Sequence, residues 1–296
     1  MRRDLCSLAV LALTAGVLAM AADAPKRQIL FFSKSAGHEH WPVRVKNGQP
    51  SFADKFFKEI GAKNNFEFTC TKDGSVFTPE GLAKFDAVMF YTSGDLTTPG
   101  HDGTTPIPKD GKETLLNYIK GGKGFVGFHC ASDTFHSHGQ QVDPYIEMIG
   151  GEFLTHGAQQ TSKITCTDAG FPGCSDWKDG VELQEEWYSV KNIAKDLHVL
   201  LVQGTSGMNG WMYQRPAYPE TWTKAYGKGR VFYTTMGDRP DVWANPLFQN
   251  LLIGGIKFAC GDLPGDTTPN VAKVTPESWT VPVAPPQPPK KADKKK

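Results

Sequence analysis

The amino-acid sequence predicts an α/β domain in which a mainly parallel β-sheet lies between two layers of helices. Short, almost continuous apolar runs recur along the chain, which is the pattern of strands buried on both faces of a sheet. Segments with helical periodicity alternate with these runs, as is typical of a three-layer α/β sandwich. With 296 residues, of which 39% are hydrophobic and 21% charged, the composition excludes a mostly disordered chain and a multi-span membrane protein.

The predicted elements follow one another along the chain. The apolar runs that we expect to form strands cover residues 28–32, 87–91, 124–129, 198–203 and 230–236. The segments that repeat apolar residues at helical spacing cover residues 51–60, 109–120 and 245–260. Pro246 falls in the first turn of the last of these helices, where its missing N–H costs no hydrogen bond.

The first 21 residues have the features of a signal peptide. Arg2 and Arg3 precede an apolar run over residues 5–20, and Ala19 and Ala21 supply the small side chains that a signal peptidase requires. The run is short for a membrane-spanning helix, and no second run of this kind follows it. We therefore expect a mature chain from Ala22, without a membrane span, in the periplasm or secreted.

The remainder of the chain divides into a domain and a tail. Residues 22–261 carry the pattern of strands and helices, whereas residues 262–296 are rich in proline and end in a cluster of lysines. A segment of this composition has few apolar side chains to bury against the entropy cost of ordering it. The sequence predicts that this tail is disordered and dispensable for folding.

The net charge bears on which partners the protein binds, and the cysteines bear on whether it contains a disulfide. Lys and Arg number 32 against 31 Asp and Glu, a formal net charge of +1, so no global field favours nucleic acid. The expected partner is a small molecule. Disulfides persist outside the cytoplasm, and Cys166 and Cys174 flank a short turn-rich stretch, so they are the pair that we expect to form a bridge.

Histidines and acidic residues gather where predicted strands end. Ligands of open α/β sheets bind beyond the carboxyl ends of the strands, so these positions matter most for function. The residues that follow or end a predicted strand, or lie in later loops, include His38, His40, His129, Asp133, His136, His156, Glu186 and Asp238. We expect His129, Asp133, His136, His156 and Glu186 to converge in one cleft.

His129 lies in the most informative local sequence. Gly127-Phe128-His129-Cys130-Ala131 has the form of a strand-to-helix elbow, in which small neighbours leave one side chain exposed over the sheet. The phase of the strand gives that place to His129 and turns Cys130 toward the packed side. A cysteine nucleophile is therefore not expected.

Several segments, in this order, resemble the ThuA-like (trehalose utilisation) family. They are GFVGFH (residues 124–129), DTF (133–135), GGEFLTH (150–156), EWY (186–188) and WTKAYGKGRVFY (222–233). The resemblance extends over residues 28–260. It implies a flavodoxin-like fold similar to that of class I glutamine amidotransferases, without glutaminase activity, in agreement with the missing elbow cysteine. It also implies a role in carbohydrate catabolism, particularly of disaccharides oxidised to 3-keto sugars.

One departure from the family pattern follows the last predicted strand. Members commonly have Gly-His there, whereas this chain has Gly237-Asp238. A catalytic histidine cannot be carried over to this position. The carboxylate of Asp238 could still accept a hydrogen bond from a sugar hydroxyl or bind a metal ion, because both roles need only a lone pair.

Two kinds of chemistry suit these side chains. As proton carriers, His129, Asp133 and Glu186 are the predicted catalytic residues. As metal ligands, His129, Asp133, His136 and His156 could hold a divalent ion, with zinc the first choice outside the cell. The predicted substrate-binding residues are His38, His40, His136, His156, Trp187, Tyr188 and Asp238, of which Trp187 and Tyr188 could stack on a sugar ring.

The sequence thus predicts an exported enzyme that acts on a disaccharide or a 3-keto-sugar derivative by His/carboxylate acid–base chemistry, with or without a metal ion. Two alternatives stay open. The chain could be a carbohydrate-binding domain without catalysis, for which the Asp238 departure is the best sign. It could also be a glycoside hydrolase that uses Asp133 and Glu186 as paired carboxylates.

Overall fold

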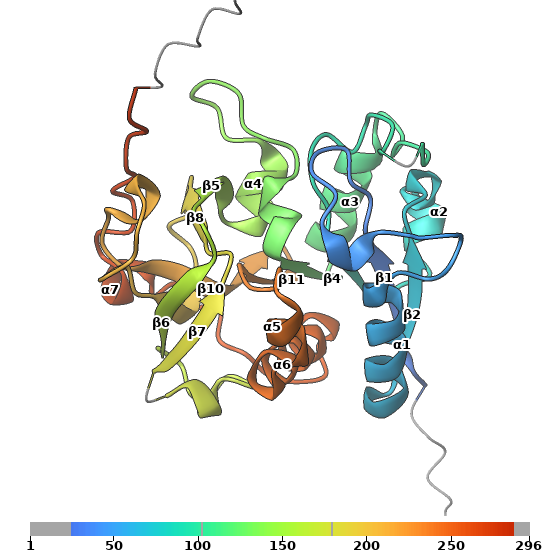
Figure 1. Ribbon diagram of the computed structural model, residues 1–296. Coiled ribbons are helices and arrows are strands. Elements are labelled where there is room, and N and C mark those ends of the chain that lie inside the picture. Colours follow the sequence, from blue (N-terminus) through green and yellow to red (C-terminus); the bar gives the residue numbers. More distant parts are fainter. Residues whose placement is uncertain (1–24, 102, 179, 287–296) are drawn as a thin grey trace, which may run out of the picture.

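The computed structural model describes residues 25–101, 103–178 and 180–286, so the predicted signal peptide lies outside the described residues. A nine-stranded sheet with the order β2-β1-β3-β4-β11-β10-β9-β6-β7 forms the centre, and β5 and β8 form a separate pair (Figure 1). The strands are β1 (Arg27–Phe32), β2 (Phe66–Thr71), β3 (Ala87–Phe90), β4 (Gly124–Phe128), β5 (Glu152–His156), β6 (Gln160–Cys166), β7 (Val181–Glu185), β8 (Tyr188–Lys191), β9 (His198–Gln203), β10 (Tyr218–Tyr226) and β11 (Gly229–Thr234).

Helices cover both faces of the sheet, which confirms the predicted three-layer α/β architecture. The helices are α1 (Phe52–Asn64), α2 (Pro79–Leu82), α3 (Gly111–Lys120), α4 (Pro144–Ile149), α5 (Pro240–Ala244), α6 (Pro246–Cys260) and α7 (Val271–Val274). Short 3-10 helices include η1 (Trp41–Val43) and η3 (His129–Asp133). All five predicted strands and all three predicted helices are present, with ends that differ by a few residues.

The sheet is parallel in one half and antiparallel in the other. Strands β2, β1, β3, β4 and β11 pair in parallel, and from β10 onward the neighbours run antiparallel. Strands β1, β3, β4, β9 and β11 were predicted from the sequence, whereas β2, β6, β7 and β10 of this sheet and the separate pair β5 and β8 were not. Because β1, β3, β4 and β11 are parallel, their carboxyl ends meet at one edge of the sheet, where a ligand site is expected.

Alternation along β1 shows how the two cores form. Ile29 and Phe31 are fully buried in the core that α1, α5 and α6 cover, whereas Leu30 and Phe32 are fully buried in the core under α2, α3 and α4. Successive side chains of a strand point to opposite faces, so an apolar run with no polar positions fits a strand covered on both sides. Figure 1 shows these helix groups on opposite sides of the sheet.

The last long helix begins as its sequence predicts. Pro246 occupies the first turn of α6, and the side chain of Asn245 accepts a hydrogen bond of 2.9 Å from the backbone N–H of Leu247. The helix ends at Gly261, which has φ 81° and so adopts the left-handed conformation that glycine tolerates best. These two signals set the ends of α6, which packs against β4 and β11, the strands that precede the candidate site.

The segment after α6 differs from the expected disordered tail over residues 262–286. The side chain of Asn270 accepts a hydrogen bond of 2.7 Å from the backbone N–H of Val199 and donates one of 3.1 Å to its carbonyl. Val271 is buried, and the guanidinium of the buried Arg215 donates to the carbonyl of Ser278. A few well-placed side chains anchor this proline-rich segment, which composition alone does not reveal. Residues 287–296 lie outside the described part.

Two further expectations concern cysteines and the membrane. Cys166 and Cys174 are free thiols rather than the expected disulfide. Within residues 25–101, 103–178 and 180–286, no helix combines the length and the apolar character that crossing a bilayer requires.

A chain that ends after Pro264 should therefore unfold at a lower temperature, by at least about 5 °C, since it loses the burial of Val271 and the Ser278 carbonyl that accepts a hydrogen bond from the buried Arg215. Thermal unfolding followed by circular dichroism measures this. Val283→Ser is the matched control, because that side chain is 89% exposed. Equal midpoints for the truncated and full chains would contradict the packing described here.

Candidate functional site

A polar cavity of about 430 Å³ lies at the carboxyl edge of the parallel strands. The residues that line it are His38, His40, Trp41, Arg44, Asp133, Phe153, His156, Glu186, Tyr188 and Asp238. A larger hollow of about 730 Å³ borders the C-terminal segment near Trp279. We assign the site to the smaller cavity because histidines and carboxylates from loops far apart in the sequence converge there.

His129 lies at the base of this site, in the first position after β4. Its backbone has φ 47°, a left-handed conformation that is costly for a residue with a Cβ. The hydroxyl of Tyr233 donates a hydrogen bond of 2.7 Å to the carbonyl of His129 and holds this turn. The elbow predicted from the sequence is therefore present.

The imidazole of His129 has a defined orientation. Nδ1 lies 2.9 Å from the carbonyl oxygen of Thr235, and because a carbonyl can only accept, Nδ1 carries the hydrogen. Nε2 is buried without a hydrogen-bond partner and lies 3.6 Å from Oε2 of Glu186. Burial lowers the pKa of His129, but the nearby carboxylates, Glu186 foremost, outweigh burial and raise it.

His40 approaches His129 from the loop after β1. The two rings lie 4.9 Å apart, nearly perpendicular, and Nε2 of His40 is 3.1 Å from the hydroxyl of Tyr188. Burial, followed by the proximity of the other histidines, lowers the pKa of His40 to about 2. His40 is therefore neutral at physiological pH, so one of its ring nitrogens has a lone pair.

Glu186 and Asp238 lie in two loops that are both hydrogen-bonded to the fully buried carboxylate of Glu185. The carboxylate of Glu185 accepts backbone hydrogen bonds of 2.7–3.2 Å from Glu186, Gly237, Asp238 and Arg239. These donors belong to the loop between β7 and β8 and to the loop between β11 and α5. Burial raises the pKa of Glu185, while the N–H groups favour its charged form.

A second buried glutamate, Glu220, is hydrogen-bonded to the loop between β11 and α5. Oε1 of Glu220, in β10, accepts hydrogen bonds from the hydroxyls of Thr234 and Thr235, both 2.9 Å, and from the backbone N–H groups of Thr235 and Met236. The segment 234–239 is thus held by two carboxylates. It supplies the Thr235 carbonyl that orients His129 and the side chain of Asp238.

Asp133 and His156 complete the wall of the cavity. Asp133 lines the cavity and lies at the end of η3. Nδ1 of the exposed His156 is 3.4 Å from Oε1 of Glu186. Of the five residues expected in one cleft, Asp133, His156 and Glu186 line this cavity, and His129 is fully buried behind them in contact with Glu186.

His136 differs from the expectation. It borders a neighbouring cavity, with Nε2 2.8 Å from Asp133 and Nδ1 3.3 Å from Glu152. The expected helix after the elbow would have carried His136 one turn beyond Asp133, but η3 ends at Asp133 and Phe135 has φ 53°, which redirects the chain. The predicted metal set of His129, Asp133, His136 and His156 is therefore not the group that the structure gathers.

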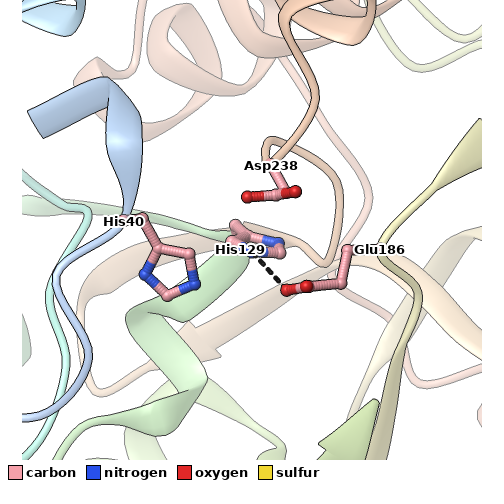
Figure 2. A group of neighbouring side chains, drawn as sticks. All are labelled: His40, His129, Glu186 and Asp238. Carbon is pink, nitrogen blue, oxygen red and sulfur yellow. Dashed lines mark ion pairs between the residues drawn. The ribbon is translucent and has the colours of Figure 1, made fainter. Parts of the chain in front are cut away.

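A different set of potential metal ligands lies together. One ligand atom from each of His40, His129, Glu186 and Asp238 is within 4.8 Å of the others. Figure 2 shows these four side chains pointing toward one another. His40 and Asp238 were predicted as substrate-binding residues; metal binding was foreseen for Asp238 as an alternative role, but not for His40.

Trp187 and Cys130 are core residues. Trp187 is fully buried and its indole N–H donates a hydrogen bond of 2.8 Å to the carbonyl of Gln160, so it cannot stack on a sugar as expected. Cys130 is buried, and burial raises the pKa of its thiol well above the usual range, which agrees with the prediction that it is not a nucleophile.

Three lining residues were missed by the sequence analysis. Trp41 donates its indole N–H to the carbonyl of Asp238, and Phe153 packs against Tyr188 with ring centroids 4.3 Å apart. Arg44 is the third. Trp41 directly follows His40, and Phe153 lies in the GGEFLTH segment. Their nearness to these motifs was the signal available in the sequence.

The comparisons with known proteins point in one direction. A family model described as trehalose utilisation (ThuA) matches residues 28–259. A ThuA-like protein from Bacteroides uniformis is similar in structure, with a TM-score of 0.62 at 20% identity over 82% of this chain and 95% of that one. A ThuA-like protein from Parabacteroides merdae has a TM-score of 0.59 at 14% identity over 87% and 96% of the two chains. No curated protein matches the chain significantly.

We expect Glu185→Gln to lower the free energy of unfolding by about 1–3 kcal/mol. The amide NH₂ of glutamine cannot accept the hydrogen bonds from backbone N–H groups that one carboxylate oxygen of Glu185 accepts. Urea unfolding measures the change. Glu182→Gln, at an exposed position of the same strand, is the control and should stay within about 0.5 kcal/mol of the unsubstituted protein. Similar losses for both variants would argue against the role of Glu185.

The ion pairs of His136 predict a pH dependence of stability. Hydrogen bonds to Asp133 and Glu152 raise the pKa of His136 to about 9, above its ordinary value of about 6.5. This stabilisation is complete below about pH 6.5 and is lost as the pH rises through 9. The difference in unfolding free energy between the unsubstituted protein and His136→Gln should therefore shrink from pH 6.5 to 9.5. His138→Gln is the control, because that side chain is exposed. An equal trend in both variants would contradict the role given to the ion pairs of His136.

Proposed function

The chain belongs to the ThuA family, which has a role related to trehalose utilisation, and we propose that it is an enzyme acting on a disaccharide or a 3-keto derivative of one. The reaction takes place in the cavity at the carboxyl edge of the sheet, by the chemistry of its histidines and carboxylates. The observation that carries this proposal is the buried imidazole of His129, whose Nε2 forms an ion pair of 3.6 Å with Glu186, a residue that lines a polar cavity.

The cavity suits a small polar ligand. Its volume of about 430 Å³ is within the usual range for small-molecule sites. Trp41 and Phe153 offer ring surfaces to the apolar face of a sugar, and the polar side chains around them can bind its hydroxyl groups. Tyr188 is buried between His129 and Phe153 and, like Trp187, is not free to stack as expected. The carboxylate of Asp238 accepts a hydrogen bond of 2.8 Å from the side chain of Gln159, which holds one of its oxygens in place.

Roles can be assigned from the positions of the side chains. His129, the deepest of the group, is the residue that we expect to act on the reacting oxygen of the sugar, with Glu186 beside it. Asp133 and His156 lie in the wall and would pass protons between the sugar and solvent. Cys130 takes no part, because its thiol is buried and protonated.

We also propose that the protein is exported to the periplasm or secreted. Support comes from the sequence of residues 1–21, which combines two arginines, an apolar run and a small-residue cleavage site. An N-terminal sequence of the protein isolated from its native host tests this, with Ala22 as the expected first residue.

The enzymatic proposal is tested by incubating the purified protein with a panel of disaccharides and their 3-keto derivatives and following the products by mass spectrometry. A new product that depends on the protein supports it. Saturable binding of a sugar without any product would instead favour a carbohydrate-binding domain and overturn the proposal of an enzyme.

On the substrate found in this way, His129→Ala should reduce kcat/KM by roughly 10²-fold or more, the scale of a lost catalytic imidazole. Cys130→Ala, the neighbouring substitution in the same turn, should stay within a few-fold of the unsubstituted protein. An inactive Cys130→Ala together with an active His129→Ala would restore a cysteine mechanism and refute the assignment.

A further inference from the structure

Four side chains at the base of the cavity form a group that has the composition of a metal centre. They come from four separate segments: His40 from the loop after β1, His129 from the start of η3, Glu186 from the loop after β7 and Asp238 from the loop after β11 (Figure 2). We propose that these four residues bind one divalent transition-metal ion, with zinc the best fit.

The spacing of the ligand atoms supports a common ion. One nitrogen or carboxylate oxygen from each residue lies within 4.8 Å of the other three. Zinc binds nitrogen and oxygen ligands at about 2.0–2.2 Å, so ligands on two sides of the ion lie up to about 4 Å apart. Small side-chain rotations would therefore bring all four atoms to one ion.

The buried imidazole of His129 provides an independent sign of a missing partner. Its side chain is fully buried, and Nε2 has no hydrogen-bond partner within the described structure. Since Nδ1 carries the hydrogen that is donated to Thr235, Nε2 is the ring nitrogen that faces the group, where it lies 3.6 Å from Glu186 as an ion pair. A bound metal ion would take the place of the Nε2 proton and would contact the carboxylates as well as the ring.

The outer contacts of the group are those that metal ligands usually have. Ligating histidines commonly donate their second ring N–H to a carbonyl or carboxylate, which fixes the ring, and ligating carboxylates are themselves hydrogen-bonded. His129 follows this pattern through Thr235. His156 lies 3.4 Å from one oxygen of Glu186, and Gln159 donates to one oxygen of Asp238. Each of these three ligands is thus held by a second group.

The donor set selects the class of ion. Two imidazoles and two carboxylates favour zinc and related first-row ions over magnesium or calcium, which prefer oxygen alone. His40, Glu186 and Asp238 also line the cavity, so a bound ion would be reachable by a ligand. When bound there, such an ion would supply a Lewis acid for a carbonyl or hydroxyl oxygen, and His129 would act as its ligand, which leaves proton transfer to Asp133 and His156.

This inference deepens the proposed function, on which its catalytic meaning rests, but metal binding can be measured without turnover. The full purified protein is stripped with a chelator, dialysed and titrated with Zn²⁺ by isothermal calorimetry. We expect one Zn²⁺ per chain, and at least about 10²-fold weaker binding for Asp238→Asn and for Glu186→Gln, which keep the size of each side chain. Circular dichroism confirms that the variants are folded.

Asp133→Asn is the matched control, because Asp133 lines the same cavity but is not among the four ligands. Its zinc affinity should stay within a few-fold of the unsubstituted protein. The inference is overturned if the unsubstituted protein does not bind zinc, or if Asp238→Asn and Glu186→Gln bind it as tightly as Asp133→Asn does. Zinc binding without sugar turnover would refute the proposed enzyme alone, and turnover by a protein that binds no metal would refute this inference alone.

Discussion

Two buried carboxylates, those of Glu185 and Glu220, hold the loop between β11 and α5, and the candidate site depends on this loop. Between them they accept backbone hydrogen bonds from every residue of the segment 235–239. Burying a carboxylate is costly unless its oxygens are hydrogen-bonded, so each glutamate constrains the N–H groups that satisfy it. The loop therefore has one conformation, which presents the carbonyl of Thr235 and the side chain of Asp238.

The same constraint determines the chemistry of His129. The left-handed turn after β4 brings its imidazole beneath the cavity, and the Thr235 carbonyl decides which ring nitrogen carries the hydrogen. Glu185 also binds the N–H of Glu186, so the carboxylate next to His129 is positioned by the same buried group that positions Asp238. A preorganised group of this kind reacts or binds without first paying to order its own side chains.

The fold could be predicted largely from the sequence, whereas the site could be predicted only in part. Strands such as β4 are buried on both faces and have unbroken apolar runs, but the antiparallel strands β6 and β7 alternate with polar residues and were missed. His129 and Asp238 were found because they end or follow predicted strands, and Glu186 because it lies in the EWY segment. The sequence could not show that Glu185 faces inward while Glu186 faces the cavity. It also could not show that the turn at Phe135 directs His136 to Glu152. Those facts depend on contacts between distant segments.

Amide hydrogen exchange, measured residue by residue by NMR, tests most directly whether the two glutamates hold the loop. If Glu185 and Glu220 hold the loop, the amides of Thr235, Met236, Gly237 and Asp238 should exchange as slowly as those of the central strands, although they lie in a loop. In Glu185→Gln, exchange at Gly237 and Asp238 should accelerate while Thr235 and Met236, held by Glu220, stay protected. Fast exchange of all four amides in the unsubstituted protein would show that the two glutamates do not hold this loop.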